Sequence, residues 1–223
     1  MAFRTPADID ALKRRGDIHG LINTLRNETF VSLREAAAKG LDSAPEAVEA
    51  LIEALRDRHP RVRAAVAEAL GRNGDSEGVV PLCESLADDD RDVAMAAAEA
   101  LGHWRSGGAV EAVMRFLAPP LRGEVARYVQ AIHALGQSRN SIFIPVLERA
   151  LDLDSERDVV RQAAKRALDE ICAARSRSMG QERAAPGEEE VGRLPGAETP
   201  SWLGMLATHT CSRNDYARMS GAE

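Results

Sequence analysis

The sequence predicts an all-α fold, a right-handed solenoid of about five stacked helix pairs. The main indication is an ending that recurs five times, in which alanines precede a leucine and usually an adjoining glycine. Its leucines lie 29, 31, 34 and 33 residues apart, and such a period is typical of stacked units that cannot bury their apolar faces alone. Aromatic residues form only 4% of the chain, which suits close helix packing by small side chains. The leucines are Leu41, Leu70, Leu101, Leu135 and Leu168.

The first element expected is a short capping helix within residues 1–16. Thr5 is a good N-cap and Pro6 suits the first helical position, where a missing N–H costs nothing. We expect the helix to cover residues 6–15. Its basic run 13–15 would then face water, as a terminal cap requires.

Residues 46–74 show the repeat most clearly. Apolar residues recur at i, i+3, i+4 and i+7 in the first half, which predicts one buried helix face. These residues are Val48, Leu51, Ile52 and Leu55. Pro60 then ends that helix, because proline disfavours helical geometry in the residue before it. A second helix follows, and Gly71 and Gly74 are expected to supply its turn. Its buried face is expected at Val62, Ala65, Val66, Ala69 and Leu70.

Five such helix pairs are expected along the chain. Pro45 suits a first helical turn. Pro81 and Pro145 fall inside first helices, where they predict kinks or late helix starts. The expected repeats are residues 17–44, 46–74, 76–106, 108–138 and 141–175.

The periodicity stops after Ala174, and residues 176–223 are expected to form a disordered tail. Proline, glycine and glutamate dominate residues 176–200, a composition typical of linkers. The apolar island 202–206 is either a docking segment or fortuitous tail sequence. The fifth pair lacks a recognisable polar cap, so self-association through that repeat or the tail stays open.

Two runs in the second repeat resemble HEAT repeats, particularly the short bacterial and archaeal form called the phycobilisome-lyase HEAT-like repeat. The resemblance covers residues 6–175 and implies the fold, whereas the repeat itself serves unrelated tasks. The runs are Asp57…Pro60-Arg61-Val62-Arg63-Ala64-Ala65 and Ala69-Leu70-Gly71.

The resemblance also implies a ladder in which a second-helix arginine bridges to an aspartate in a turn. Because only three of the five matching positions are arginine, the ladder should break at the third and fourth repeats. These arginines are expected to be structural. The matching positions are Arg34, Arg63, Ala94, Tyr128 and Arg161.

Charge and cysteine content exclude several classes of protein. A net charge of −6 argues against a general nucleic-acid binder. The three cysteines show neither zinc-site nor disulfide spacing, and Cys83 is expected to be a small buried apolar residue. No apolar stretch has the length of a signal peptide or a membrane span. We therefore expect a cytoplasmic protein without membrane contact.

The sequence predicts no enzymatic activity, no cofactor and no metal site. It contains no phosphate loop, dinucleotide-binding turn or nucleophile elbow. None of its five histidines has metal-ligand spacing, and none begins a His-Glu pair of the kind found in deoxyhypusine hydroxylase, a HEAT-like iron enzyme.

A protein partner is expected along the second helices, which line the concave side in arrays of the type that this chain resembles. One position on the second helix is polar in all five repeats, although a solvated face predicts the same pattern. This column consists of Lys39, Glu68, Glu99, His133 and Arg166. The third-to-fourth junction is irregular and gathers ring side chains of the kind enriched in binding hot spots; Trp104 could instead fill a wedge in the stack. The candidate residues are Lys39, Glu68, Glu99, Trp104, Tyr128, His133 and Arg166.

The charge distribution favours a mildly acidic partner segment. First-helix segments carry 5 basic and 14 acidic residues, whereas second-helix segments carry 12 basic and 10 acidic residues. The second helices thus offer arginine to carboxylates. The prediction is a non-catalytic protein-interaction scaffold or adaptor. The alternatives are a catalytic or accessory subunit related to bilin lyases, and a nucleic-acid-binding HEAT-like protein.

Overall fold

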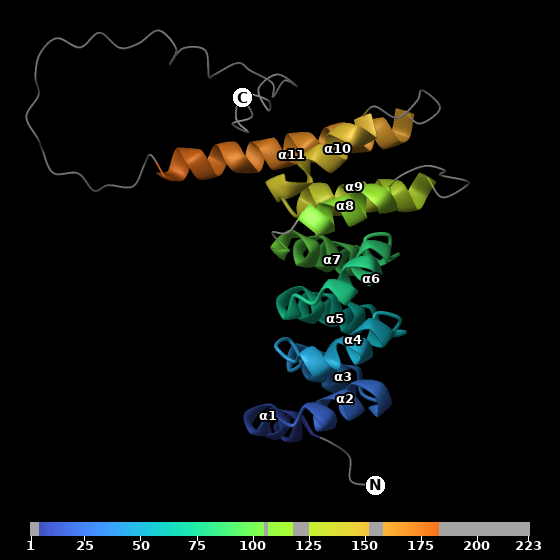
Figure 1. The fold of residues 1–223 in the computed structure, drawn as a ribbon, viewed down its shortest axis with the longest axis vertical. Coiled ribbons are helices and arrows are strands. Elements are labelled where there is room, and N and C mark those ends of the chain that lie inside the picture. Colours follow the sequence, from blue (N-terminus) through green and yellow to red (C-terminus); the bar gives the residue numbers. More distant parts are fainter. Residues whose placement is uncertain (1–4, 105–106, 118–124, 152–157, 183–223) are drawn as a thin grey trace, which may run out of the picture. The chain divides into compact units, whose positions relative to one another are not determined.

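The computed structural model describes residues 5–104, 107–117, 125–151 and 158–182. These residues form eleven α-helices and three short 3-10 helices without a β-strand, which confirms the all-α solenoid (Figure 1). Backbone contacts divide the chain into residues 1–171 and residues 172–223. The helix pairs are α2 (Ile18–Asn27) with α3 (Val31–Lys39), α4 (Val48–Ala54) with α5 (Pro60–Asn73), α6 (Val79–Ser85) with α7 (Arg91–His103), α8 (Gly107–Phe116) with α9 (Val125–Gln137), and α10 (Ile144–Leu151) with α11 (Asp158–Glu182).

Successive second helices pack against one another. Helix α3 contacts α5, α5 contacts α7, and α7 contacts α9, while each of α2, α4 and α6 packs on the second helix of its own pair. In Figure 1 the pairs from α2 to α9 follow one another in chain order. The core is therefore one apolar seam that passes from pair to pair.

Helix α1 (Pro6–Arg15) packs on α2 and α3 and has the bounds that the sequence predicts. The Thr5 backbone N–H and hydroxyl donate to one carboxylate oxygen of Asp8 at 2.7 and 2.8 Å. Gly16 ends the helix with a φ of 65°, a left-handed conformation that glycine adopts without strain. Ile9 is fully buried and fixes α1 to the stack.

The apolar stripes of the second repeat are buried as the helical period predicts. Val48, Leu51 and Leu55 are buried on the first helix, while Ile52 is half-buried. All five positions expected on the second helix are buried. Removing a leucine side chain from water contributes about 2 kcal/mol, so these stripes are a main source of stability.

Prolines delay the first helices, as expected. Three of these helices begin with a 3-10 turn: η1 (Pro45–Ala47), η2 (Ser76–Gly78) and η3 (Ser141–Phe143). The α-helical part then starts at Val48, Val79 and Ile144. Pro81 and Pro145 thus stand in the first α-helical turn, where N–H groups have no intrahelical partner.

Gly74 supplies the turn after α5, with a φ of 73°, but the expectation that Gly71 does so is wrong. Gly71 lies inside α5, where a Cβ would stand 2.6 Å from the Cβ and 2.7 Å from the Cα of Ala100. Glycine is required there because α5 and α7 approach closely. Gly136 lies in the same way against Ala167, whereas Gly102 faces the side chain of Asn140.

Helix α11 continues to Glu182, so the expectation of a linker from residue 176 is wrong for residues 176–182. Seven of residues 173–182 are alanine, arginine, methionine, glutamine or glutamate, which are good helix formers even without an apolar stripe; the others are two serines and a glycine. Residues 183–223, including the island 202–206, lie outside the described residues. None of the described helices is both long and apolar enough to cross a membrane.

Candidate functional site: the second-helix face

A buried ion pair joins the first two repeats. Arg34 of α3 donates to the two carboxylate oxygens of Asp57 at 2.8 and 3.0 Å. Its remaining nitrogen donates to the carbonyls of Glu28 and Thr29, both at 3.0 Å. The Arg34 side chain is only 5% exposed, and its planar fork matches the carboxylate, so its role is structural.

The second pair repeats this geometry one unit further along. Arg63 of α5 donates to both oxygens of Asp88 at 2.8 and 2.7 Å, and to the Asp57 carbonyl at 2.9 Å. The hydrogen bond and charge of Asp88 raise the pKa of Arg63 despite partial burial. Burial raises the pKa of Asp57, but hydrogen bonds from Arg34 and the His59 backbone outweigh it, so that pKa lies below its ordinary value.

The ladder arginine is absent from the third and fourth repeats, where the sequence predicts a break. Ala94 takes the arginine position in α7, and Tyr128 of α9 stacks on Phe116 of α8 with ring centroids 6.0 Å apart. Gln130 of α9 instead donates to the Asp88 carbonyl. In the fifth repeat Arg161 donates to the Leu151 carbonyl at 3.3 Å.

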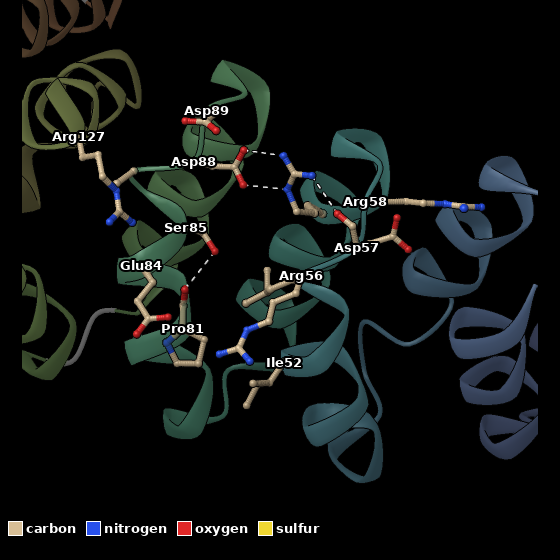
Figure 2. Close-up of a pocket in the computed structure, with 13 residues that line it drawn as sticks. Ile52, Arg56, Asp57, Arg58, Pro81, Glu84, Ser85, Asp88, Asp89 and Arg127 are labelled. Carbon is tan, nitrogen blue, oxygen red and sulfur yellow. Dashed lines mark hydrogen bonds and ion pairs between the residues drawn. The ribbon is translucent and has the colours of Figure 1, made fainter. Parts of the chain in front are cut away.

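A cavity with a volume of about 700 Å³ lies at the turns of the second and third repeats (Figure 2). Its wall includes the Arg63–Asp88 pair, and Ser85 donates to the Pro81 carbonyl at 3.0 Å. The ladder supplies three of its nine polar lining residues, Asp57, Arg63 and Asp88. Figure 2 shows Arg127 and Glu84 on one side of this cavity and Arg56 and Ile52 on the other.

Two grooves lie on the second-helix face. The first, groove A, has a volume of about 180 Å³ and is lined by α3, α5 and the start of α7. In it Glu35 pairs with Lys39 at 2.8 Å and with Arg61 at 3.1 Å. The hydrogen bond from Lys39 lowers the pKa of Glu35 against the effect of burial. Groove A is lined by Glu35, Lys39, Pro60, Arg61, Ala64, Ala65, Glu68, Asp90 and Asp92.

The second, groove B, has a volume of about 440 Å³ and lies between α7 and α9. Small apolar side chains share its lining with Arg91, Gln130 and His133. Arg91 donates from Nε to the side-chain oxygen of Gln137 at 3.0 Å, which ties its guanidinium to α9. Groove B is lined by Arg91, Ala94, Ala126, Val129, Gln130, His133, Ala134 and Gln137.

Comparison with known proteins gives the family. The sequence pattern of HEAT repeats matches residues 18–102 and 79–169, most of the array described above. The chain belongs to the HEAT-repeat family. No functionally curated protein matches this HEAT chain. Among solved structures it is similar to the complex of CpcE and CpcF of phycocyanin lyase from Nostoc sp. PCC7120, with 26% identity over 77% of this chain and 71% of that chain, and a TM-score of 0.45.

The candidate partner-binding residues that the sequence predicts do not lie in one groove of the HEAT array. Lys39 and Glu68 line groove A, and His133 lines groove B. Glu99 of α7 and Arg166 of α11 are exposed and line neither groove. The column that is polar in every repeat is thus spread over several surfaces.

Trp104 and Tyr128, although both near the irregular junction, make separate contacts. Trp104 follows α7 and donates from its indole nitrogen to the Gly74 carbonyl at 3.0 Å, across the preceding turn. Asn73, at the matching place at the end of α5, donates to the Ala44 carbonyl, and Asn140 after α9 donates to the Gly102 carbonyl. Trp104 therefore replaces an asparagine in a second row of inter-repeat hydrogen bonds. Tyr128 packs within its own helix pair.

Sequence reasoning missed Arg91, Gln130 and Gln137 as residues of one groove. The sequence did contain one signal for this groove, the alanine at ladder position 94, because Ala94 also lines groove B. Side-chain reach across two helices, however, depends on how far apart α7 and α9 stand, which periodicity does not give. Among the described residues, no group of three metal-ligating side chains could hold a metal ion.

Proposed function

We propose that this HEAT array is a non-catalytic scaffold that binds a protein partner along its second-helix face. The supporting observation is the pair of grooves A and B, which open between successive second helices. Extended repeat surfaces of this kind suit elongated partners better than small substrates. In this proposal Lys39, Glu68 and His133 contact the partner within the grooves, and Glu99 and Arg166 contact it beside them.

The two ladder pairs support this assignment by holding the surface rigid. Arg34 and Arg63 each donate to a carboxylate of the next repeat, and they donate to two carbonyls and one carbonyl, respectively, of their own turns. A preorganised surface loses little conformational entropy when it binds. The scaffold can thus present its grooves without rearrangement.

Photo-crosslinking from defined positions tests the proposal. A photoreactive phenylalanine analogue replaces Glu68, Glu99 or Arg166 on the second helices, or Glu49 or Val80 on the first helices, where both residues are exposed. We expect one and the same partner to crosslink from the second-helix positions only. Equal crosslinking from both layers, or crosslinking from first helices alone, would contradict the proposal.

Two spectroscopic and binding measurements test the alternatives. A visible absorption band from a bilin on the purified chain would overturn the non-catalytic assignment in favour of a lyase-related role. Tight oligonucleotide binding that weakens steeply with salt would indicate a nucleic-acid-binding protein instead. We expect neither.

A further inference from the structure

We propose that groove B binds an acidic segment of the partner protein that carries an apolar side chain beside its carboxylates. The inference rests on the proposed scaffold function and deepens it by naming the partner's chemistry. Its basis is the set of side chains that meet between α7 and α9, and their contrast with those of groove A.

Groove B opens at the third repeat, where alanine takes the ladder position of arginine. In the preceding repeats a second-helix arginine fills the space beside the next turn, as Arg63 does at Asp88. Ala94 has no such reach, and Gln130 from the far side of groove B bonds only the Asp88 carbonyl. Groove B has a volume of about 440 Å³, within the range of about 300–1,000 Å³ usual for ligand sites.

The lining of groove B suits an apolar side chain flanked by negative charge. Four of its eight residues are alanine or valine, and these offer an apolar surface. Arg91 and His133 stand in the same lining. The structure gives no partner, among the described residues, to the terminal nitrogens of Arg91 or to the ring of His133, so both can donate to a carboxylate.

The two grooves differ in the charge of the residues that line them. The described lining of groove B includes no aspartate or glutamate, although the chain has 35 acidic residues. Groove A holds four carboxylates against two cations, and Glu35 already pairs with both cations. An acidic segment would be repelled at groove A and attracted at groove B. The mildly acidic partner that the sequence predicts is therefore assigned to α7 and α9.

Peptide selection on the full chain tests the inference. A random peptide library is selected against the purified protein, and enriched peptides are measured by fluorescence anisotropy. We expect enrichment of aspartate or glutamate next to leucine, isoleucine, valine or phenylalanine, with affinity that falls as salt is raised. Enrichment of basic or uncharged peptides would overturn the inference.

Matched variants test which groove binds the selected peptide. Arg91→Gln should weaken binding about tenfold, the effect of one lost charge-assisted hydrogen bond. Arg61→Gln is the control, because Arg61 also lies in the first turn of a second helix but lines groove A. It should change the affinity for the selected acidic peptide less than about twofold, because that peptide is assigned to groove B and not to groove A. Ala126→Trp, from an exposed position at groove B, should abolish binding by filling the groove.

The outcomes separate this inference from the scaffold proposal. Unchanged circular dichroism and thermal midpoints show that each variant folds. If Arg61→Gln weakens binding and Arg91→Gln does not, groove B is the wrong site while the scaffold proposal stands. If no peptide is enriched but second-helix positions still crosslink a protein, the acidic-segment inference fails alone. If neither occurs, both proposals fail.

Discussion

Asp57 joins two repeats through a single carboxylate. It accepts hydrogen bonds from Nε and Nη2 of Arg34 and from the backbone N–H of His59, the last at 2.8 Å. Its side chain is 12% exposed, so loss of its charge would strand a buried guanidinium. Removing one partner of a buried pair is far more destabilising than the pair is stabilising.

We expect Asp57→Asn to lower the free energy of unfolding by about 3 kcal/mol, measured by urea denaturation. The control is Glu53→Gln, which breaks the exposed pair with Arg26. An exposed pair contributes less than about 1 kcal/mol. Equal losses in the two variants would show that burial of the Arg34–Asp57 pair does not increase the loss of unfolding free energy when the pair is broken.

The pH dependence of stability should follow the lowered pKa of Asp57. Because that pKa lies below its reference value of 3.8 in the folded state, the carboxylate adds stability at higher pH, and this is lost as the pH falls through the folded pKa. The stability difference between wild type and Asp57→Asn should therefore shrink in acid below 3.8. A difference that grows in acid would contradict the assignment.

Cys83 should resist alkylation while the protein is folded. Burial, and to a lesser extent the charge of Glu84, raise the pKa of its thiol to about 12, and only the thiolate reacts. Mass spectrometry after iodoacetamide treatment near neutral pH should find the Cys83 peptide unmodified. The same treatment in denaturant should label it, and labelling of the folded protein would refute its burial.

Helix α5 depends on a glycine at its closest contact with α7. Gly71→Ala would place a methyl group 2.7 Å from the Cα of Ala100, a backbone atom that cannot move aside alone. We expect a loss of about 2 kcal/mol in unfolding free energy, as for other overpacked interfaces. The matched change Gly108→Ala, at an exposed position in α8, should leave stability equal or slightly higher.

Element positions could be predicted well from the sequence because each follows from local chemistry. The Thr5-Pro6 start and the delayed helices at Pro81 and Pro145 depend on residues near one another in the chain, and the ladder break at Ala94 follows from the resemblance to HEAT repeats. Gly71 could not be assigned correctly, because its role depends on the approach of α7. Groove B was missed for the same reason. The partner-binding roles of Lys39, Glu68, Glu99, Trp104, Tyr128, His133 and Arg166 stay predictions.

A cavity made in one helix pair should destabilise mainly that pair and its neighbours. Leu101 is fully buried in α7, and Leu101→Ala should remove about 3 kcal/mol through the cavity it leaves. Since each pair contacts mainly its neighbours, hydrogen exchange should accelerate in α5 and α7 more than in α2. Leu33→Ala in α3 should instead accelerate exchange around α2 and α3. Uniform acceleration in both variants would indicate one cooperative unit.

The contacts of Gly71 and Gly136 have a mechanical consequence. At α5–α7 and at α9–α11 a glycine meets the backbone of an alanine on the next second helix, and two backbones pressed together cannot slide. At the step between these seams Gly102 meets the Asn140 side chain, which is held by one hydrogen bond to the Gly102 carbonyl and can move more easily than a backbone. Under tension the α7–α9 step should therefore yield before the α5–α7 and α9–α11 steps, and a partner segment bound between α7 and α9 would stiffen it.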